Sequence, residues 1–351
     1  MKAPTFSGIV SVVAAAICAL SAAPAQAYSD LFVFGDSYSD SGNVGIVLGH
    51  PGGVPQAVSN TYIPSAPYPT DGTYSPAVFS NGPVWVSRFA DKLGLSVGPS
   101  LGGYIGLSWG TDFAFAGART ASDPAGGVPS VKSQVGMFLS TTGGVAPPSA
   151  LYVVEDIGND TRDALTAIFL GAVLVATVQA TATAYALNVG AIVDTLQAAG
   201  AKDILVFNAA NVGLAPSVTA LGALASSVGS FVSGAMSTAL SGRLASEPGV
   251  TVFDSYSFIS SVVAQPGTYG FTNATDACGG AAAGTDCSKY FFWDGLHPTA
   301  AGHQAIADAI YAQLVPEPET YALMALGFAV IGLAARRRKS TRAPRSAEAM
   351  T

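Results

Sequence analysis

The sequence predicts an α/β protein whose centre is a parallel β-sheet of about five strands. Short apolar runs rich in β-branched or aromatic residues recur along the chain, and Ala-rich or helically spaced stretches separate them. Because strands and helices alternate, we expect a parallel sheet with helices on both faces. The expected strands are Leu31–Phe34, Phe113–Phe115, Leu151–Ile157, Ile204–Phe207 and Val250–Phe253, and the expected helices lie within Val84–Leu93, Ala164–Ala199, Ala220–Ala245 and Ala300–Leu314.

Residues 1–27 predict a secretory signal peptide. A lysine near the start is followed by the apolar run Ile9–Leu20, and the segment closes with Ala25-Gln26-Ala27. This A-x-A ending after an apolar run is typical of a signal peptidase cleavage site. We therefore expect the mature protein to be exported.

Residues 315–340 carry a second targeting pattern. Val315-Pro316-Glu317-Pro318-Glu319 precedes the apolar stretch Tyr321–Ala335, and the cluster Arg336-Arg337-Arg338-Lys339 follows it. The stretch is shorter than the about 20 residues of a full membrane span, and the basic cluster places the main body on the far side of the membrane. One interpretation is a simple C-terminal anchor with a short transmembrane helix.

The same order of features resembles the PEP-CTERM sorting signal of Gram-negative bacteria. The resemblance implies processing by an exosortase-type enzyme, with the helix in the membrane at least before processing. It also implies a location at the cell surface, in the extracellular matrix or on the periplasmic side of the membrane. Residues 341–351 are expected to form a disordered basic tail.

Residues 28–314 suit one domain, because no interior linker, internal repeat or long charge run divides them. Between residues 28 and 315, eight Lys and Arg stand against nineteen Asp and Glu, a formal net charge of −11. An acidic body argues against nucleic acid as a partner and against adsorption to anionic lipid through charge.

Cys278 and Cys287 form one pair in the body, nine positions apart. A disulfide agrees with export and would close a flexible loop, with a stabilisation of about 2–3 kcal/mol from the loop entropy. The alternative is a metal site, but the body has only three histidines and no Cys-x-x-Cys pattern. We expect the disulfide, and no metal or cofactor.

Gly35-Asp36-Ser37 follows the first expected strand, at the sheet edge where α/β proteins form their sites. A serine there, beside backbone N–H groups that no helix uses, is well placed to act as a nucleophile. The wider Gly-x-Ser-x-Gly elbow is absent, because Ser39 stands at its second Gly position. A polar turn after a strand is also common without a catalytic role, so the interpretation depends on a base and oxyanion donors further along the chain.

Asp294 and His297 supply a candidate base in the turn before the last expected helix. The carboxylate can accept a hydrogen bond from one imidazole nitrogen, which leaves the other nitrogen to take the proton of a serine hydroxyl. A lone histidine would more often be structural, but the candidate serine after the first strand favours catalysis. His303 lies on the following helix and is expected to be a surface or packing residue.

Gly117 and Asn159 follow the second and third expected strands and are candidate oxyanion donors. Small residues at 116–118 let the backbone approach a ligand, and an Asn amide can donate without changing its protonation state. Each also has a structural interpretation on local grounds. Gly117 would then permit tight packing, and Asn159 would form a turn or a helix cap.

These blocks, in this order, resemble the SGNH/GDSL hydrolase family. The segment Phe79–Trp85 also looks like the one that follows the first block in its longer lipase/acylhydrolase members. The resemblance implies a flavodoxin-like three-layer α/β/α fold and hydrolysis of carboxylic esters without a metal. By residue it implies Ser37 as nucleophile, His297 as base, Asp294 as its orienting acid, and an oxyanion hole from the Ser37 and Gly117 N–H groups and the Asn159 amide.

Two positions depart from the family pattern. Asp112-Phe113-Ala114 stands where longer members often have Asn-Phe-Ala, and we expect little catalytic effect because Asp112 precedes Gly117 by five residues. Ile157 stands where the third block usually has Gly. A β-branched residue resists positive φ and can re-aim Asn159, and loss of one oxyanion donor costs about 10²–10³ in rate.

The resemblance implies an exported serine ester hydrolase of the lipase/esterase type that works through an acyl-enzyme. Its substrate would be a small acyl ester or a lipid. An alternative, suggested by the sorting tail, is the removal of acetyl groups from an acylated exopolysaccharide. A different class of protein is a non-catalytic surface or matrix protein that retains the fold, which the departure at Ile157 favours.

Two segments, Val44–Ser80 and Gly267–Lys289, are expected to shape the substrate pocket. In the first, Tyr62, Tyr68 and Tyr74 stand among Pro and Gly. They would form a lid or a sugar-stacking wall, or belong to a plain coil over the core.

Overall fold

The computed structural model describes residues 28–49, 78–123, 127–155 and 158–315, together with residues 327 and 330. The expected signal peptide, the tyrosines at 62, 68 and 74, Ile157, the basic tail and nearly all of the sorting segment lie outside the described residues. The chain divides into two compact units, Tyr28–Ile310 and a second unit of Met1–Ala27 with Tyr311–Thr351. The fold described below is that of the first unit.

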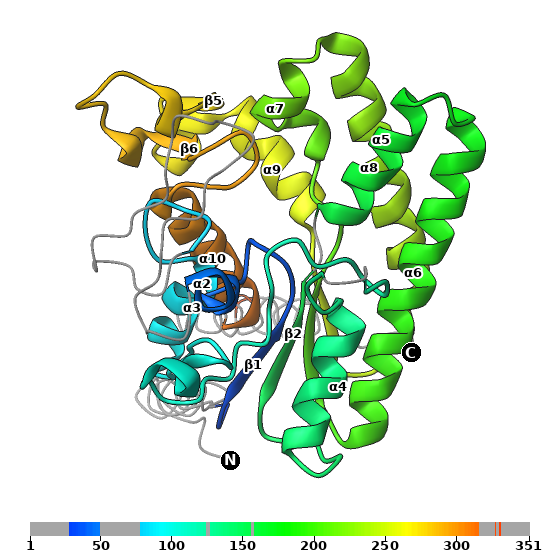
Figure 1. Ribbon diagram of the computed structural model, residues 1–351, viewed down its shortest axis with the longest axis vertical. Coiled ribbons are helices and arrows are strands. Elements are labelled where there is room, and N and C mark those ends of the chain that lie inside the picture. The colour runs from blue at the N-terminus through cyan, green and yellow to red at the C-terminus, as the bar shows by residue number, and fades with distance from the viewer. Residues whose placement is uncertain are drawn as a thin grey trace, which may run out of the picture. The chain divides into compact units, whose positions relative to one another are not determined.

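Four parallel strands form the central sheet in the order β1-β2-β3-β4 (Figure 1). Leu31 pairs with Leu151, and Leu151 pairs with Asp203, so neighbouring strands start at the same level and end at one common edge. A parallel sheet with helices on both sides confirms the predicted α/β class. The strands are β1 (Leu31–Phe34), β2 (Leu151–Val154), β3 (Asp203–Phe207) and β4 (Val250–Phe253).

The fifth strand expected at Phe113–Phe115 is not formed, and among the residues that the structure describes the central sheet has four strands rather than about five. The segment does run beside β1, because Phe113 N donates to Val33 O at 2.7 Å and Phe115 N donates to Gly35 O at 3.1 Å. However, the next ladder bond is not formed, because Gly35 N donates to the Gln134 side chain at 2.8 Å instead of to the Phe113 carbonyl. Only an isolated bridge between Val33 and Asp112 remains of the expected strand.

Helices cover both faces of the sheet. In Figure 1, α2, α3 and α10 lie on one side of β1 and β2, and α4 and α6 lie on the other. The helices are α2 (Asn43–Gly49), α3 (Trp85–Leu93), α4 (Val131–Thr141), α5 (Asn159–Phe169), α6 (Leu174–Ala199), α7 (Pro216–Thr219), α8 (Ala223–Leu244), α9 (Ser255–Ala264) and α10 (Ala300–Leu314). Short 3₁₀ turns occupy Gly102–Ile105, Val212–Leu214, Pro266–Tyr269, Cys278–Gly280 and Cys287–Lys289.

Aromatic side chains fill the core on each face. Phe138 of α4 packs against Phe34 and Tyr152, with ring centroids 5.5 and 5.8 Å apart. On the other face, Trp85 of α3 lies 4.9 Å from Phe207 of β3. All five side chains are almost completely buried, so the sheet is held from both sides by apolar packing.

Two expected elements have different bounds. The helical stretch expected within Ala164–Ala199 is two helices, α5 and α6, because the chain turns at Gly171, whose φ of 103° is accessible mainly to glycine. The strand expected to reach Ile157 ends at Val154.

Within the described part of the chain, α8 is the helix that is long and apolar enough to cross a membrane. Its Val232, Met236 and Leu240 are buried in the core beside the sheet, as in a core helix of a globular domain. The predicted C-terminal span at Tyr321–Ala335 lies, apart from residues 327 and 330, outside the described residues.

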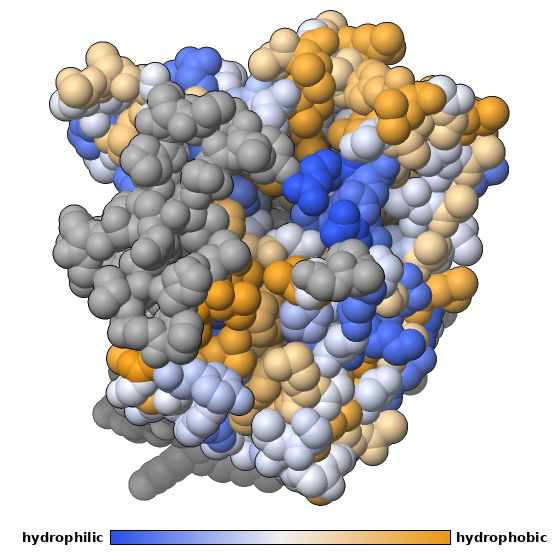
Figure 2. Space-filling model, in the orientation of Figure 1, coloured by the Kyte–Doolittle hydropathy of each residue, from blue (hydrophilic) through white to orange (hydrophobic). Residues whose placement is uncertain are grey.

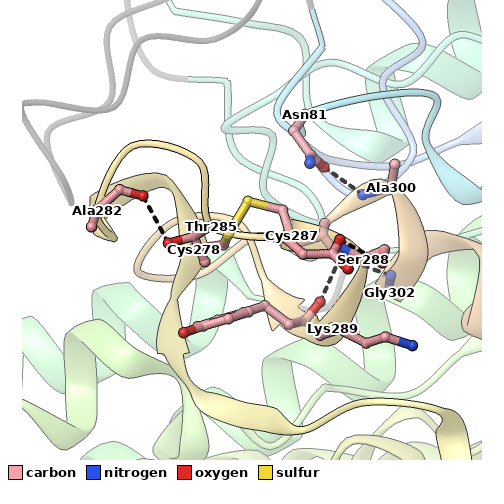
Figure 3. The surroundings of a disulfide bond; sticks show 12 residues. Asn81, Cys278, Ala282, Thr285, Cys287, Ser288, Lys289, Ala300 and Gly302 are labelled. Carbon is pink, nitrogen blue, oxygen red and sulfur yellow. Dashed lines mark hydrogen bonds between the residues drawn. A yellow bond between two sulfur atoms is a disulfide. The ribbon is translucent and has the colours of Figure 1, made fainter.

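A small second sheet follows α9. It pairs β5 (Asn273–Ala277) with β6 (Tyr290–Phe292), and the chain between them carries Cys278 and Cys287. Figure 3 shows these two cysteines joined by a disulfide. Because β6 leads directly into Asp294, this part of the predicted pocket segment Gly267–Lys289 supports the turn that carries the candidate base.

Candidate active site

Ser37 lies in a tight turn immediately after β1. The turn is closed by Ser39 N and Asp40 N, which both donate to Asp36 O at 3.2 and 3.0 Å. Gly35 is required here, because a Cβ at this position would lie 2.4 Å from the Glu155 carboxylate. The turn therefore ends the strand abruptly and presents Ser37 at the carboxyl edge of the sheet.

Three predicted site residues come together at this edge. The Ser37 hydroxyl lies 2.7 Å from His297 Nε2, and His297 Nδ1 lies 2.6 Å from Asp294 Oδ2. The three residues are buried, with Ser37 the most exposed at 6%. This is the geometry of a serine whose proton can pass to an imidazole that a carboxylate orients.

The turn from Asp294 to His297 is fixed from several directions. Asp294 Oδ1 accepts hydrogen bonds from the backbone N–H groups of Leu296 and His297, both at 2.6 Å, so one oxygen holds the turn and the other holds the imidazole. Trp293 N closes the turn by donating to His297 O at 2.7 Å. The Tyr38 hydroxyl donates to Leu296 O at 2.8 Å and so joins this turn to the turn of Ser37.

Asn159 lies at the start of α5, and its side chain reaches the Ser37 turn. Its amide Nδ2 donates to Asp36 Oδ2 at 3.0 Å, and the residue is buried. Gly117 ends the segment that runs beside β1, two residues after the hydrogen bond between Phe115 N and Gly35 O. Its φ of 87° suits glycine. Both predicted oxyanion residues thus belong to segments that border the Ser37 turn.

Glu155 is a buried carboxyl group that the sequence interpretation missed. It follows β2, and its Oε2 accepts a hydrogen bond from Asp36 N at 3.1 Å. Burial and the negative charge of Asp36 raise the pKa of Glu155 well above its ordinary value. Burial also raises the pKa of Asp36, although hydrogen bonds and the nearby His297 oppose the effect. A signal was present, since a carboxyl group directly after an apolar strand points to the same sheet edge as Ser37.

Gln134 of α4 was missed for a different reason. Its Oε1 accepts from Gly35 N at 2.8 Å, and its Nε2 donates to Gly35 O at 2.9 Å. The side chain replaces the strand partner that Gly35 lacks at the end of β1. No feature of the sequence distinguishes this glutamine from a surface residue of a helix.

Asp40 and Asp112 hold the segment that leads to Gly117. Asp40 accepts hydrogen bonds from four backbone N–H groups, including that of Ala116 at 2.8 Å, and Asp112 accepts from Ser41 N at 2.7 Å. Burial raises the pKa of Asp40 to about 6, although these four donors oppose the shift. Burial and the charge of Asp40 raise the pKa of Asp112 well above its usual range. Asp112, expected to have little catalytic effect, is thus a structural link between the Ser37 turn and the Gly117 segment.

His303 of α10 is a packing residue rather than a surface residue. It is fully buried, and its ring meets the Tyr38 ring edge-on at 6.0 Å. Among the described residues, neither of its ring nitrogens has a hydrogen-bond partner. Burial, with the nearby His297 and Arg88, lowers the pKa of His303 to about 3.

The disulfide lies beside the turn that carries the candidate base. The 3₁₀ turn at Cys278–Gly280 donates from Gly279 N to Trp293 O at 2.7 Å, one residue before Asp294. Figure 3 also shows Asn81, which accepts a hydrogen bond from Ala300 N at 2.7 Å at the start of α10. The segment around Asn81, which follows the first block in the sequence, therefore fixes the start of the helix after His297.

Comparison with known proteins places this site in a family. The model of the GDSL-like lipase/acylhydrolase family matches residues 31–310, and the PEP-CTERM protein-sorting motif matches residues 314–339. The sorting motif indicates export to the cell envelope or surface. Both resemblances noted in the sequence are thereby confirmed.

Two curated relatives are similar to the chain. An "uncharacterized protein in trpE-trpG intergenic region" of Pseudomonas putida is 27% identical over 349 residues, which cover 89% of this chain and 53% of that protein. A GDSL esterase/lipase of Arabidopsis thaliana is 32% identical over 79 residues, which cover 19% of this chain and 22% of that protein. The chain thus spans about half the length of the first relative and about a fifth of the second. Since the family model spans the sheet, the Ser37 turn and the turn of Asp294 and His297, this chain belongs to the GDSL-like lipase/acylhydrolase family.

Proposed function

We propose that this protein is an exported carboxylic ester hydrolase with Ser37 as its nucleophile. The observation that carries the proposal is the chain of hydrogen bonds from Ser37 through His297 to Asp294, at 2.7 and 2.6 Å. Membership of a lipase/acylhydrolase family supports ester hydrolysis in general. The complete arrangement of the three residues favours an enzyme over a non-catalytic surface protein.

In the first half of the reaction, the Ser37 oxygen attacks the ester carbonyl carbon while its proton passes to His297 Nε2. The tetrahedral intermediate then expels the alcohol, which takes the proton from His297, and the acyl group stays on Ser37. In the second half, water attacks the acyl-enzyme and gives a proton to His297. Collapse of the second intermediate releases the acid and returns the proton to Ser37. Asp294 accepts the hydrogen bond of Nδ1–H throughout and stabilises the imidazolium.

The negative charge of both intermediates would be held by the N–H groups of Ser37 and Gly117 and by the Asn159 amide. An amide NH₂ has two hydrogens. Asp36 accepts one of them, at 3.0 Å, which orients the amide and leaves the second for a substrate oxygen. This division supports a positioning role for Asp36 in the turn, with Asp294 as the acid of the proposed triad.

The sorting motif supports a second candidate substrate and a partner. A hydrolase delivered to the cell surface would meet acetyl groups on exopolysaccharide as well as acyl lipids. The motif also implies an exosortase-type enzyme that processes the tail. The mass of the C-terminus of cell-derived protein tests this, because cleavage would remove the apolar stretch and the basic cluster, and an uncleaved anchor retains them.

The proposed activity is tested with the full chain and p-nitrophenyl esters from acetate to longer acyl chains. We expect hydrolysis by the native protein and by Ser140→Ala, which removes an exposed serine of α4, and a loss of at least about 10³-fold in Ser37→Ala. A fluorophosphonate should label Ser37 in the native protein. Hydrolysis that persists in Ser37→Ala, or a folded native protein that neither hydrolyses any ester nor takes the label, would overturn the proposal.

A further inference from the structure

A cavity of about 290 Å³ lies between α5 and α7, close to the candidate active site. We infer that it binds the unbranched acyl chain of the substrate, which makes esters of medium-chain fatty acids the preferred substrates over acetyl esters. This inference rests on the proposed function and names its substrate class. The walls of the cavity consist of Gly158, Arg162, Leu165, Thr166, Phe169, Val212, Ser217, Val218, Leu221 and Leu296.

Two of these residues connect the cavity to the catalytic groups. Gly158 directly precedes Asn159, the candidate oxyanion residue, and Leu296 directly precedes His297. Ser217 N of α7 donates to Gly295 O at 2.9 Å, so the wall of the cavity is bonded to the turn of the candidate base. The cavity wall therefore includes the sequence neighbours of both the candidate oxyanion residue and the candidate base.

A smaller cavity of about 10 Å³ adjoins the larger one. It shares Gly158, Val212 and Leu296 with the larger cavity and adds Tyr38, the residue after the candidate nucleophile. This volume is about that of one water-sized probe. A single methylene group fits such a space, whereas a sugar ring with its hydroxyl groups does not.

The walls favour an apolar occupant. Leu165, Val218 and Leu296 present hydrocarbon, and the hydroxyl of Thr166 is already used by a hydrogen bond to Arg162 O at 2.8 Å. Apart from Arg162 and Ser217 the walls offer few polar groups, so a sugar placed here would lose most of its hydrogen bonds to water without replacing them. An added methylene, in contrast, should raise kcat/KM about fourfold as long as the chain still finds room in the cavity.

The mouth of the cavity is also apolar. Phe169 and Leu221 line it and are 51% and 70% exposed. Figure 2 shows hydrophobic surface in the region of α7. An entrance of this kind suits a lipid chain, because the walls and the rim can contact it along its whole length.

The volume sets the chain length. The cavity holds about as much as ten water molecules at their liquid volume of about 30 Å³ each, and a methylene group is of similar size. We therefore expect an optimum at about eight to ten carbons, with a decline for longer chains. The chain belongs to the acyl half, because in lipid esters of glycerol or sugars the unbranched apolar chain is the acid.

The experiment measures kcat/KM for p-nitrophenyl esters of two to sixteen carbons with the full chain. Thr166→Trp places an indole at the cavity from an exposed position of α5. Thr195→Trp is the matched control, because Thr195 is also exposed and also donates to the carbonyl four residues earlier, Ala191 O at 2.7 Å, on α6. We expect Thr166→Trp to lower kcat/KM at least about tenfold for the octanoate ester and less than twofold for the acetate ester. Thr195→Trp should keep the native profile.

Binding gives a second measurement without turnover. Octanoate should bind to Ser37→Ala by calorimetry, and the added change Thr166→Trp should abolish this binding. Methyl octanoate and octyl acetate distinguish the two halves of the ester, and we expect preference for methyl octanoate.

Four outcomes would overturn the inference while leaving the proposed function intact, provided that hydrolysis still depends on Ser37. These are a profile without preference for longer chains, an unchanged profile in Thr166→Trp, equal losses in both Trp variants, and preference for octyl acetate. Absence of all hydrolysis together with absence of fluorophosphonate labelling at Ser37 would overturn the proposed function itself.

Discussion

Glu155 Oε2 accepts a hydrogen bond from the backbone N–H of Asp36 at 3.1 Å, directly beside the candidate nucleophile. Two buried carboxyl groups thus lie together behind Ser37. Burial and the charge of Asp36 raise the pKa of Glu155 well above its ordinary value, so the fold favours the protonated form of Glu155. Asp36 Oδ2 in turn accepts a hydrogen bond from the amide of Asn159.

Glu155→Gln should therefore keep activity within about threefold and stabilise the fold at high pH. An amide resembles the protonated acid and can still accept the Asp36 N–H. Because the folded pKa of Glu155 is raised, the unfolded chain releases this proton at a lower pH than the folded chain does, so stability falls as the pH rises above about 4.5. Urea unfolding at pH 5 and pH 8 should show an advantage of the variant that grows with pH.

Glu247→Gln is the control for this prediction, since it removes one carboxylate from the end of α8, where Glu247 pairs with Arg243. Its effect on stability should not grow between pH 5 and pH 8. If Glu155→Gln were instead less stable than the native protein at pH 8 and inactive, Glu155 would be ionised in the fold.

The sequence predicts those parts of the fold whose signals are local. The apolar runs at Leu31–Phe34 and Val250–Phe253 coincide with β1 and β4, and Ala300–Leu314 coincides with α10. Phe113–Phe115 has the same apolar character, but Gly35 N donates to the Gln134 side chain, so the ladder with β1 is reduced to an isolated bridge. That competition comes from a side chain 99 positions away from Gly35, which local residue patterns do not encode.

The candidate site also contains residues that local motifs predict and residues that they do not. Ser37 and His297 stand 260 positions apart, yet each lies in a short motif whose residue types indicate its chemistry, and the structure brings their side chains within 2.7 Å. Glu155 and Asp40 were overlooked because isolated acidic residues are ordinarily exposed. Their burial depends on backbone donors from distant segments, such as Ala116 N, and only the assembled fold shows these donors.

Asp294→Asn should lower kcat by about 10⁴ with little change in KM. The amide oxygen can still accept from Leu296 N and His297 N, so the turn is kept, but an NH₂ group then faces His297 Nδ1. The proton would move to Nε2, which could no longer take the proton of Ser37. Steady-state kinetics check this, with Asp30→Asn at an exposed position as the control. A decrease in kcat of less than tenfold would contradict the role of Asp294.

Asn159→Ala should lower kcat by about 10²–10³, because one oxyanion donor is lost. Asn159→Asp should lower kcat further, since a second carboxylate would face Asp36 Oδ2. In the native protein this oxygen accepts a hydrogen bond from the Asn159 amide at 3.0 Å. KM should change much less than kcat in both variants, because the donor acts mainly on the transition state. Equal kcat in Asn159→Ala and the native protein would remove Asn159 from the oxyanion hole.

His303→Leu should make the free energy of unfolding fall less steeply as the pH is lowered from 7 to 4. The folded pKa of about 3 lies below the ordinary 6.5, so between these values the unfolded chain binds a proton that the folded chain refuses. In this range the contribution of His303 lowers the free energy of unfolding by about 1.4 kcal/mol for each unit by which the pH falls. Chemical denaturation of both proteins from pH 7 to pH 4 isolates this contribution as a difference, and parallel curves would contradict it.

The pair Cys278→Ser and Cys287→Ser should lower the free energy of unfolding by about 2–3 kcal/mol and also reduce kcat. The loss of rate is expected because the Cys278–Gly280 turn donates to Trp293 O, next to Asp294. Native protein treated with a reductant should behave like the double variant. Mass analysis of protein from an oxidising compartment should find the two cysteines joined, whereas two free thiols would refute the bond.

The position of this disulfide ties the order of the candidate site to the redox state of its surroundings. Before translocation the chain occupies a reducing compartment, in which cysteines stay as thiols. The turn that carries Asp294 and His297 would then lack the cross-link that supports its neighbour at Trp293. The proposed hydrolase would therefore complete its site only after export, when the two thiols are oxidised.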